Sequence, residues 1–191
     1  AIQPGEPLDF CVPTGNFGDI LAGYYAKAIG VPVGRLICAS NQNKVLADFF
    51  ETGTASTMRD FYKTSSPSRD ILVSSNLERL LYHESGSGAQ VRKWMAQLAD
   101  KGAYTVDEGV MERIRATFAA GWADEEQVSG EIKRIYETYN YLCDPHTAVA
   151  FRVQQQLAAR EAKRPTVVVS TANPYKFSGK VLAALGRPVP E

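Results

Sequence analysis

The sequence predicts an α/β fold in which helices cover a mainly parallel sheet. Residues 8–12 form a short apolar run, which a glycine-rich turn joins to a helical pattern over residues 19–29. A second strand-like run at 35–40 leads into a helical pattern at 43–51, and four β-branched residues stand in a row at 166–169. Strands that alternate with helices in this way indicate βαβ units, whose strands run parallel.

The composition is that of an ordinary globular protein with the size of one domain. Of the 191 residues, 45% are hydrophobic and 22% are charged, and the net charge is zero. Neutrality argues against a general nucleic-acid binder, which usually carries a basic surplus. The sequence has no long apolar run typical of a membrane helix, no secretory leader at its start and no paired cysteine spacing. We therefore expect a cytoplasmic protein with no nucleic-acid or membrane partner.

The first elements have clear boundaries. Prolines flank the strand at 8–12, and Gly30 follows the helix at 19–29 as a stop signal. Residues 52–70 are rich in Thr, Ser, Arg and Asp, which predicts a long loop, and such loops are often functional. A helix resumes at 76–83, with Asn76 as a suitable N-cap residue.

The middle of the chain predicts helices and little chemistry. Residues 89–139 carry two or three amphipathic patterns with breaks at 101–103 and 120–122, so we expect a helical insertion over about 86–141. Asp144 is suited to cap the next helix, with Pro145 in its first turn. After the strand at 166–169, the residues STANP end the strand and a last helix runs through Leu185.

The segment VPTGNFGD at 12–19 is the most informative motif, because it joins a strand to a helix. Its glycines allow positive φ and a close approach of the backbone to an anion, and the helix start adds a favourable partial charge. Phosphate is the natural ligand of such a turn. No Lys-Ser/Thr ending follows, so ATP or GTP is not expected. A purely structural turn, with Asp19 capping the helix, is the alternative reading.

Four segments in order resemble the threonine synthase family of pyridoxal-phosphate (PLP) enzymes. They are VPTGNFGDILAGYYAKAIG near the start, SSPSRDILVSSNLERLLY, CDPHTAVA, and VVVSTANPYKF near the end. The resemblance spans almost the whole chain. It implies a three-layer αβα fold of the fold type II, tryptophan synthase β-like class, with residues 1–191 as one piece of the cofactor-phosphate-binding large domain.

The resemblance also implies a cofactor site. In the family the glycine turn holds the phosphate of PLP, mostly through backbone N–H groups, and a hydroxyl at a strand end contacts the pyridine nitrogen. Carried over to this chain, the phosphate would be bound by Gly15, Asn16, Phe17, Gly18 and Asp19, and the hydroxyl would come from Thr171 or, as second choice, Ser170.

Substrate contacts are predicted less directly. Hydroxyl-rich segments and a lone histidine give the candidates Ser66, Ser68, Asn76 and His146, each of which has a plain structural alternative as a loop or cap residue. Arg69, Asn173 and Tyr175 depart from the Met, His and Ala expected of the family, which puts a shared role in doubt. Cys143 and His146 do not make a closed zinc site, so no metal is predicted.

The family's covalent PLP lysine has no counterpart in this sequence, since no lysine stands in a matching context. The chain therefore reads as a fragment of a threonine synthase, which converts O-phosphohomoserine and water to threonine and phosphate. Its expected partners are that substrate, the missing N-terminal part of the enzyme and a second copy of the fragment. The alternatives are a non-catalytic phosphate- or PLP-binding module and another fold type II PLP lyase.

Overall fold

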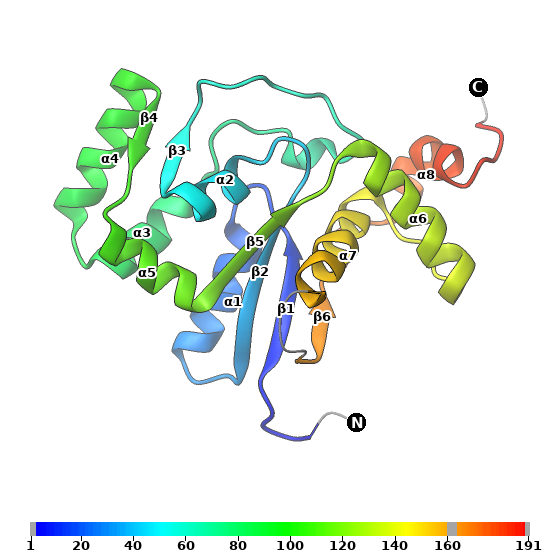
Figure 1. Ribbon diagram of the computed structural model, residues 1–191, viewed down its shortest axis with the longest axis horizontal. Coiled ribbons are helices and arrows are strands. Elements are labelled where there is room, and N and C mark those ends of the chain that lie inside the picture. The colour runs from blue at the N-terminus through cyan, green and yellow to red at the C-terminus, as the bar shows by residue number, and fades with distance from the viewer. Residues whose placement is uncertain (1–2, 160–163, 190–191) are drawn as a thin grey trace.

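A computed structural model describes residues 3–159 and 164–189 of the chain (Figure 1). The first half contains β1 (Leu8–Pro13), α1 (Gly18–Ala28), β2 (Val33–Ser40), α2 (Val45–Thr52), β3 (Thr54–Ser56), η1 (Pro67–Arg69), α3 (Leu77–Ser85) and α4 (Gly88–Lys101). The second half contains β4 (Ala103–Thr105), α5 (Glu108–Thr117), β5 (Phe118–Trp122), α6 (Glu125–Tyr139), α7 (Pro145–Ala158), β6 (Thr166–Val168), η2 (Pro174–Phe177) and α8 (Ser178–Ala184).

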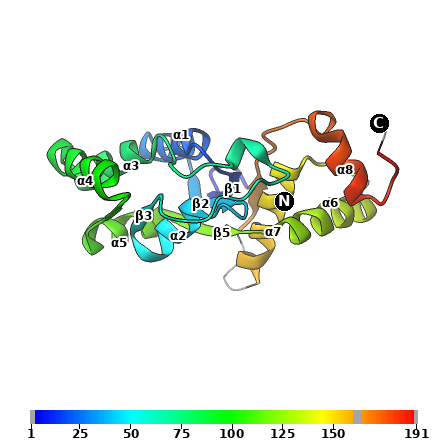
Figure 2. The same ribbon diagram turned by 90° about the horizontal axis from the view of Figure 1, so that it is seen from above.

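The main sheet has four strands in the order β5-β2-β1-β6. Every neighbouring pair is parallel: β1 lies between β2 and β6, and β5 pairs with β2. Helices α1 to α5 lie on one side of this sheet and α6 to α8 on the other (Figure 2). The predicted α/β class with a parallel sheet and three αβα layers is confirmed.

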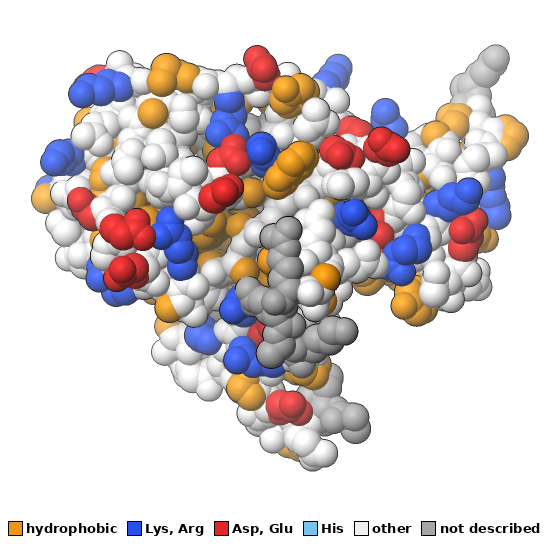
Figure 3. Space-filling view, in the orientation of Figure 1, with side chains coloured by type: hydrophobic (Ala, Val, Ile, Leu, Met, Phe, Trp, Pro, Cys, Tyr) orange, Lys and Arg blue, Asp and Glu red, His pale blue; other side chains and the backbone are white. Residues whose placement is uncertain are grey.

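Two apolar clusters fill the spaces on the two sides of the sheet. Along β2, Leu36 and Cys38 belong to the cluster beneath α1 to α5, whereas Ile37 and Ala39 belong to the cluster beneath α7. This alternation follows from the two-residue period of a strand. Because both faces are covered, the central strands read as continuous apolar runs. On the surface, acidic and basic side chains are interspersed over the face that Figure 3 shows.

Helices do break at 101–103 and 120–122, but β4 begins at the first break and β5 includes the second, so the expectation of helices alone over 86–141 was wrong there. Strand β4 pairs antiparallel with β3, which lies inside the loop predicted for 52–70. Strand β5 forms the edge of the main sheet. Its sequence FAAGW lacks the β-branched residues that identified β6. The small residues have a packing reason, because a Cβ on Gly121 would lie 2.8 Å from Cγ1 of Val153 in α7.

Candidate functional site

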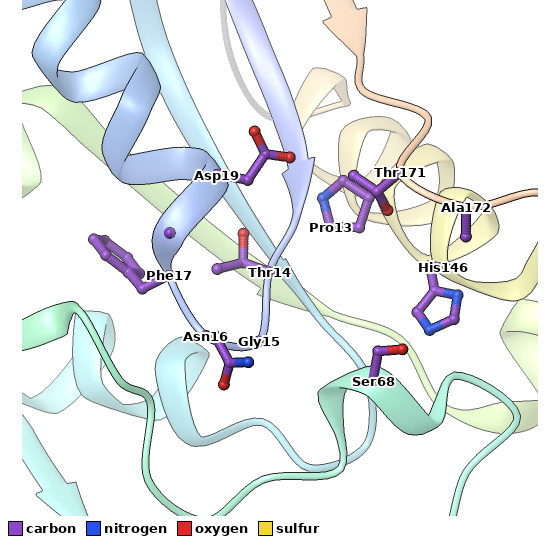
Figure 4. A pocket seen from close by; sticks show the side chains of 11 residues that line it. Pro13, Thr14, Gly15, Asn16, Phe17, Asp19, Ser68, His146, Thr171 and Ala172 are labelled. Carbon is purple, nitrogen blue, oxygen red and sulfur yellow. The ribbon is translucent and has the colours of Figure 1, made fainter.

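A cavity of about 280 Å³ opens beyond the carboxyl end of β1, where the glycine turn leads into α1 (Figure 4). Its walls come from four parts of the chain that are far apart in sequence. The lining residues are Pro13, Thr14, Gly15, Asn16, Phe17, Gly18, Asp19, Ser68, His146, Thr171 and Ala172. In an open α/β sheet this edge is the usual place for a small ligand.

The glycine turn is held in an uncommon backbone conformation by packing. Phe17, the residue before α1, has φ 62° and ψ −4°, in the left-handed region. Non-glycine residues rarely adopt this region, which costs about 1–2 kcal/mol. The Phe17 ring is buried, with its centroid 5.8 Å from that of Phe118 and 6.2 Å from that of Phe50. Burial of the ring therefore anchors the turn and offsets its strain.

Hydrogen bonds fix both ends of the turn. The Thr14 backbone N–H donates to the Ala39 carbonyl at 2.9 Å, and the Thr14 hydroxyl donates to the Val12 carbonyl at 2.7 Å. Further along, the Gly15 carbonyl accepts from the Ser74 hydroxyl at 2.6 Å. These bonds tie the turn to β2 on one side and to the segment before α3 on the other.

Asn76 contacts the same turn and does not act as the predicted side-chain cap. It occupies the position before α3 with φ 71° and makes no capping hydrogen bond with its side chain. Its Nδ2 donates instead to the carbonyl of Asn16 at 2.8 Å. Asn76 also lies outside the cavity lining, so the structure does not bring it to the site as a substrate contact.

His146 forms the opposite wall with Thr171, and Asp144 orients its ring. The Asp144 carboxylate caps α7 by accepting from the backbone N–H groups of His146 and Thr147, as the sequence predicted. The same carboxylate lies 2.7 Å from His146 Nδ1 and accepts from the Thr147 hydroxyl. Burial raises the pKa of Asp144, but hydrogen bonds from the side chains of His146 and Thr147 and from the His146 backbone outweigh it, so the pKa is lowered. Asp144 is therefore a charged anchor for one wall.

Ser170 lies next to this network and not in the cavity. Its hydroxyl oxygen is 3.3 Å from the Thr147 hydroxyl and accepts from the Tyr141 hydroxyl at 3.5 Å. Thr171, the following residue, lines the cavity. Of the two predicted hydroxyl residues, Thr171 lines the cavity and Ser170 does not.

Ser68 reaches the cavity from η1, and a buried polar network holds η1 in place. The Asp70 carboxylate accepts from Asn41 Nδ2 at 3.0 Å, from Asn43 Nδ2 at 2.9 Å and from the Thr64 hydroxyl at 2.7 Å. Ser66 belongs to this network, since its hydroxyl accepts from Asn41 Nδ2 at 3.0 Å. Ser66 is completely buried and does not line the cavity.

The predicted residues therefore divide into two groups. The structure brings Gly15, Asn16, Phe17, Gly18, Asp19, Ser68, His146 and Thr171 together around one cavity, and it places Ser66, Asn76 and Ser170 outside the lining. Sequence reasoning did not assign a supporting role to Ser74, Asp70 or Asp144: Ser74 belonged to a hydroxyl-rich segment considered for substrate contact, and Asp144 was read as a helix cap alone. The spacing of Asp144 two residues before His146 was the available signal for the last of these.

Metal-binding clusters and membrane-spanning helices are both absent from the described part of the chain. Within residues 3–159 and 164–189, no group of three or more His, Cys, Asp or Glu residues could hold a metal ion. None of the helices described there is both long enough and apolar enough to cross a membrane. Fold and cavity together define an α/β protein with a small-ligand crevice at the carboxyl ends of parallel strands.

Comparisons with known proteins refine this class. The family model "Threonine synthase, C-terminal" matches residues 147–191. Threonine synthase from Saccharomyces cerevisiae is 37% identical over 199 residues, and the alignment covers 96% of this chain and 39% of that protein. Human threonine synthase-like 1 is 40% identical over 186 residues, covering 96% of this chain and 25% of that protein.

A solved structure shows the same relationship. The PLP-bound threonine synthase from Brucella melitensis superimposes with a TM-score of 0.90 and 40% identity, over 96% of this chain and 39% of that chain. The chain is thus related to the threonine synthases over nearly its whole length, and it has the fold of a segment of these fold type II PLP enzymes. It spans 25–39% of the length of the relatives described here.

Proposed function

We propose that this chain binds the phosphate group of PLP in the cavity. We further propose that the protein to which it belongs is a threonine synthase, a carbon–oxygen lyase that converts O-phosphohomoserine and water to threonine and phosphate. The observation that carries the proposal is the cavity itself, which places the glycine turn on one wall and Thr171 on the other. The similarity to threonine synthases over 96% of the chain supports the choice of cofactor and reaction.

The residues present fit the phosphate group. Backbone N–H groups in a turn that includes a left-handed residue form an anion-binding concavity, and Phe17 is such a residue. The turn leads directly into α1, whose N-terminus favours negative charge. Asp19 would contribute its backbone N–H, because its carboxylate would repel a phosphate. The amides of the turn and the helix start therefore suit a phosphate better than a cation.

Thr171 is suited to the other end of the cofactor. A hydroxyl can hydrogen-bond a ring nitrogen without protonating it, so Thr171 would orient the ring and leave the nitrogen largely neutral. Bound PLP would supply an electron sink for negative charge that develops on the substrate.

His146 and Ser68 are the proposed substrate contacts, since both line the cavity beside the turn. Asp144 holds the His146 ring through Nδ1, and Phe177 packs against the same ring at a centroid distance of 4.8 Å. A ring fixed in this way keeps one orientation toward the cavity. His146 would thus position a substrate group, and Ser68 would add a hydroxyl from η1.

The covalent PLP lysine is proposed to come from a part of the protein outside this chain. The described residues that line the cavity include no lysine. The relatives are longer than this chain, which covers 39% of the yeast enzyme, so they contain further sequence that could supply one. The remainder of the protein and the substrate are accordingly the proposed partners, and cytoplasmic location and self-association of the chain remain predictions.

Titration of the chain with PLP, pyridoxal and inorganic phosphate tests the phosphate site. We expect PLP to bind more tightly than pyridoxal and inorganic phosphate to compete with it. Thr171→Val should weaken PLP binding about fivefold, the equivalent of one hydrogen bond of about 1 kcal/mol, and leave phosphate affinity unchanged. Thr166→Val on β6 removes a hydroxyl outside the cavity and serves as the matched control.

Two outcomes would contradict the proposal at different points. Equal affinity for PLP and pyridoxal would show that the turn does not bind the phosphate.

Borohydride reduction followed by intact mass measurement tests whether the covalent lysine lies outside this chain. A stoichiometric adduct on one lysine of this chain would show that the covalent residue is present here after all.

A further inference from the structure

Two side chains outside the cavity hold two consecutive carbonyls of the glycine turn. The Ser74 hydroxyl donates to the Gly15 carbonyl at 2.6 Å, and Asn76 Nδ2 donates to the Asn16 carbonyl at 2.8 Å. The turn residues line the cavity, whereas Ser74 and Asn76 do not. The two donors therefore contact the turn at its carbonyls without lining the cavity themselves.

The geometry of the peptide bond links these carbonyls to the amides of the next residues. In a planar trans peptide, the C=O of one residue and the N–H of the next point in opposite directions. No cis peptide bond occurs in the described part of the chain. A hydrogen bond that fixes the direction of the Gly15 carbonyl consequently also fixes the direction of the Asn16 N–H, and the Asn16 carbonyl has the same relation to the Phe17 N–H.

We propose that Ser74 and Asn76 are positioning residues that fix the Asn16 and Phe17 amides in the orientation that binds phosphate. The inference rests on the proposed function, because it assigns a preorganising role around the same phosphate. Without the two donors, the Gly15 and Asn16 peptide planes could rotate. Part of the binding free energy of an anion would then be lost in reorienting them. Neither side chain touches the ligand in this arrangement.

The backbone at Asn76 supports a role beyond capping a helix. Asn76 adopts φ 71°, and its side chain makes no cap hydrogen bond with α3. Asparagine tolerates this left-handed conformation better than most residues and still provides an amide donor. A Cβ built on Gly18 would lie 3.6 Å from Asn76 Nδ2, which places this amide directly against the turn.

The two donors lie on the segment 68–76, which also brings Ser68 to the cavity. After Ser68 the segment contains Asp70 with its hydrogen-bond network, then Ser74 and finally Asn76. Asp70 anchors it to Asn41 and Asn43 after β2. The segment thus presents Ser68 to the cavity at one end and orients the phosphate amides at the other.

The test compares variants that remove the donors with little change in the backbone. Asn76→Gly removes the amide and keeps a residue that readily adopts positive φ. Ser74→Ala removes the hydroxyl, and Ser74→Thr restores one. Ser75→Ala is the matched control, since Ser75 is exposed and adjacent. Inorganic phosphate and PLP are the probes, and pyridoxal is the ligand that lacks the phosphate.

We expect Asn76→Gly and Ser74→Ala each to weaken phosphate and PLP binding about tenfold, because charge-assisted hydrogen bonds lose their preorganised geometry. Pyridoxal binding should not change, Ser74→Thr should recover most of the affinity, and Ser75→Ala should match the parent. In ¹H–¹⁵N spectra, the Asn16 and Phe17 amides of the parent should shift downfield with phosphate, and these shifts should shrink in both variants.

The outcomes separate the positioning role from the proposed function. If the parent binds phosphate and the Asn76→Gly and Ser74→Ala variants bind it equally tightly, the positioning role is overturned and the proposed function is not. A parent that binds no phosphate would contradict the proposed function. In that case the carbonyl ¹³C shifts of Gly15 and Asn16, measured without ligand, still test the two hydrogen bonds. If these shifts are the same in the variants as in the parent, the positioning role is overturned.

Discussion

Replacing Phe17 by glycine should harm the protein less than replacing it by alanine, the reverse of the usual order. The ring is 1% exposed and packs against Phe50 and Phe118. Either substitution removes this packing, and truncation of a buried phenylalanine to alanine costs about 3–5 kcal/mol. The two variants differ in the backbone, because residue 17 has φ 62°.

The expected difference follows from two opposing terms. Alanine retains the left-handed strain of about 1–2 kcal/mol, which glycine avoids. Glycine loses about 0.5–1 kcal/mol more conformational entropy on folding than alanine. The Phe17→Gly variant should therefore be about 0.5–1 kcal/mol more stable than Phe17→Ala.

Urea unfolding at constant pH measures both variants, provided that their m-values agree. Ala22→Gly in α1 supplies the control, since it lies on an exposed helical position and should lose about 1 kcal/mol. An alanine variant at position 17 as stable as the glycine variant would refute the view that packing holds Phe17 in a strained conformation.

Two further stability predictions concern Asp144 and the glycines. Because folding lowers the pKa of Asp144, its ionised form stabilises the protein above about pH 4, the usual pKa of an aspartate, and this contribution is lost as the pH falls through the lower pKa of the folded state. In Asp144→Asn, the urea unfolding midpoint should fall less steeply as the pH is lowered below about 4, whereas substitution of the exposed Asp60 by Asn should not change this pH dependence. The same pH dependence in Asp144→Asn and the parent would contradict a stabilising role for the ionised Asp144. Gly130→Ala in α6, where a Cβ meets nothing within 4 Å, should stabilise by about 0.5–1 kcal/mol. Gly121→Ala should cost about 1–3 kcal/mol, because its Cβ would lie 2.8 Å from Val153. A lower calorimetric melting temperature for Gly130→Ala, or a higher one for Gly121→Ala, would contradict the corresponding prediction.

Local sequence signals predicted the parts of the fold that depend on neighbouring residues. The apolar run of β1, the four β-branched residues around β6 and the cap at Asp144 each carry a strong short-range preference. The glycine turn was recognised for the same reason, since it stands between a strand and a helix. Strand β5 escaped this reasoning because it has no β-branched residue, and because the close approach of α7 that requires a glycine at position 121 is a contact distant in sequence.

The site shows the same division between local and long-range causes. The turn and Thr171 were predicted as a pair, but only through the resemblance to threonine synthases. The placement of Asn76 could not be predicted, because its side chain bonds a carbonyl 60 residues earlier in the chain. Ser66 was a substrate candidate by composition, and its burial beside Asn41 depends on a contact across 25 residues.

By itself, the sequence determined the α/β class and the phosphate-suited turn after β1, because these depend on residue type and on spacing along the chain. It indicated the family through the resemblance of four segments to threonine synthases. The tertiary structure decided which hydroxyls face the cavity and which support it. It placed Ser68, His146 and Thr171 around one cavity and brought Ser74 and Asn76 into hydrogen bonds with the carbonyls of the turn. The physical reason is that parallel strands bring their carboxyl ends to one edge of the sheet, where segments far apart in sequence meet.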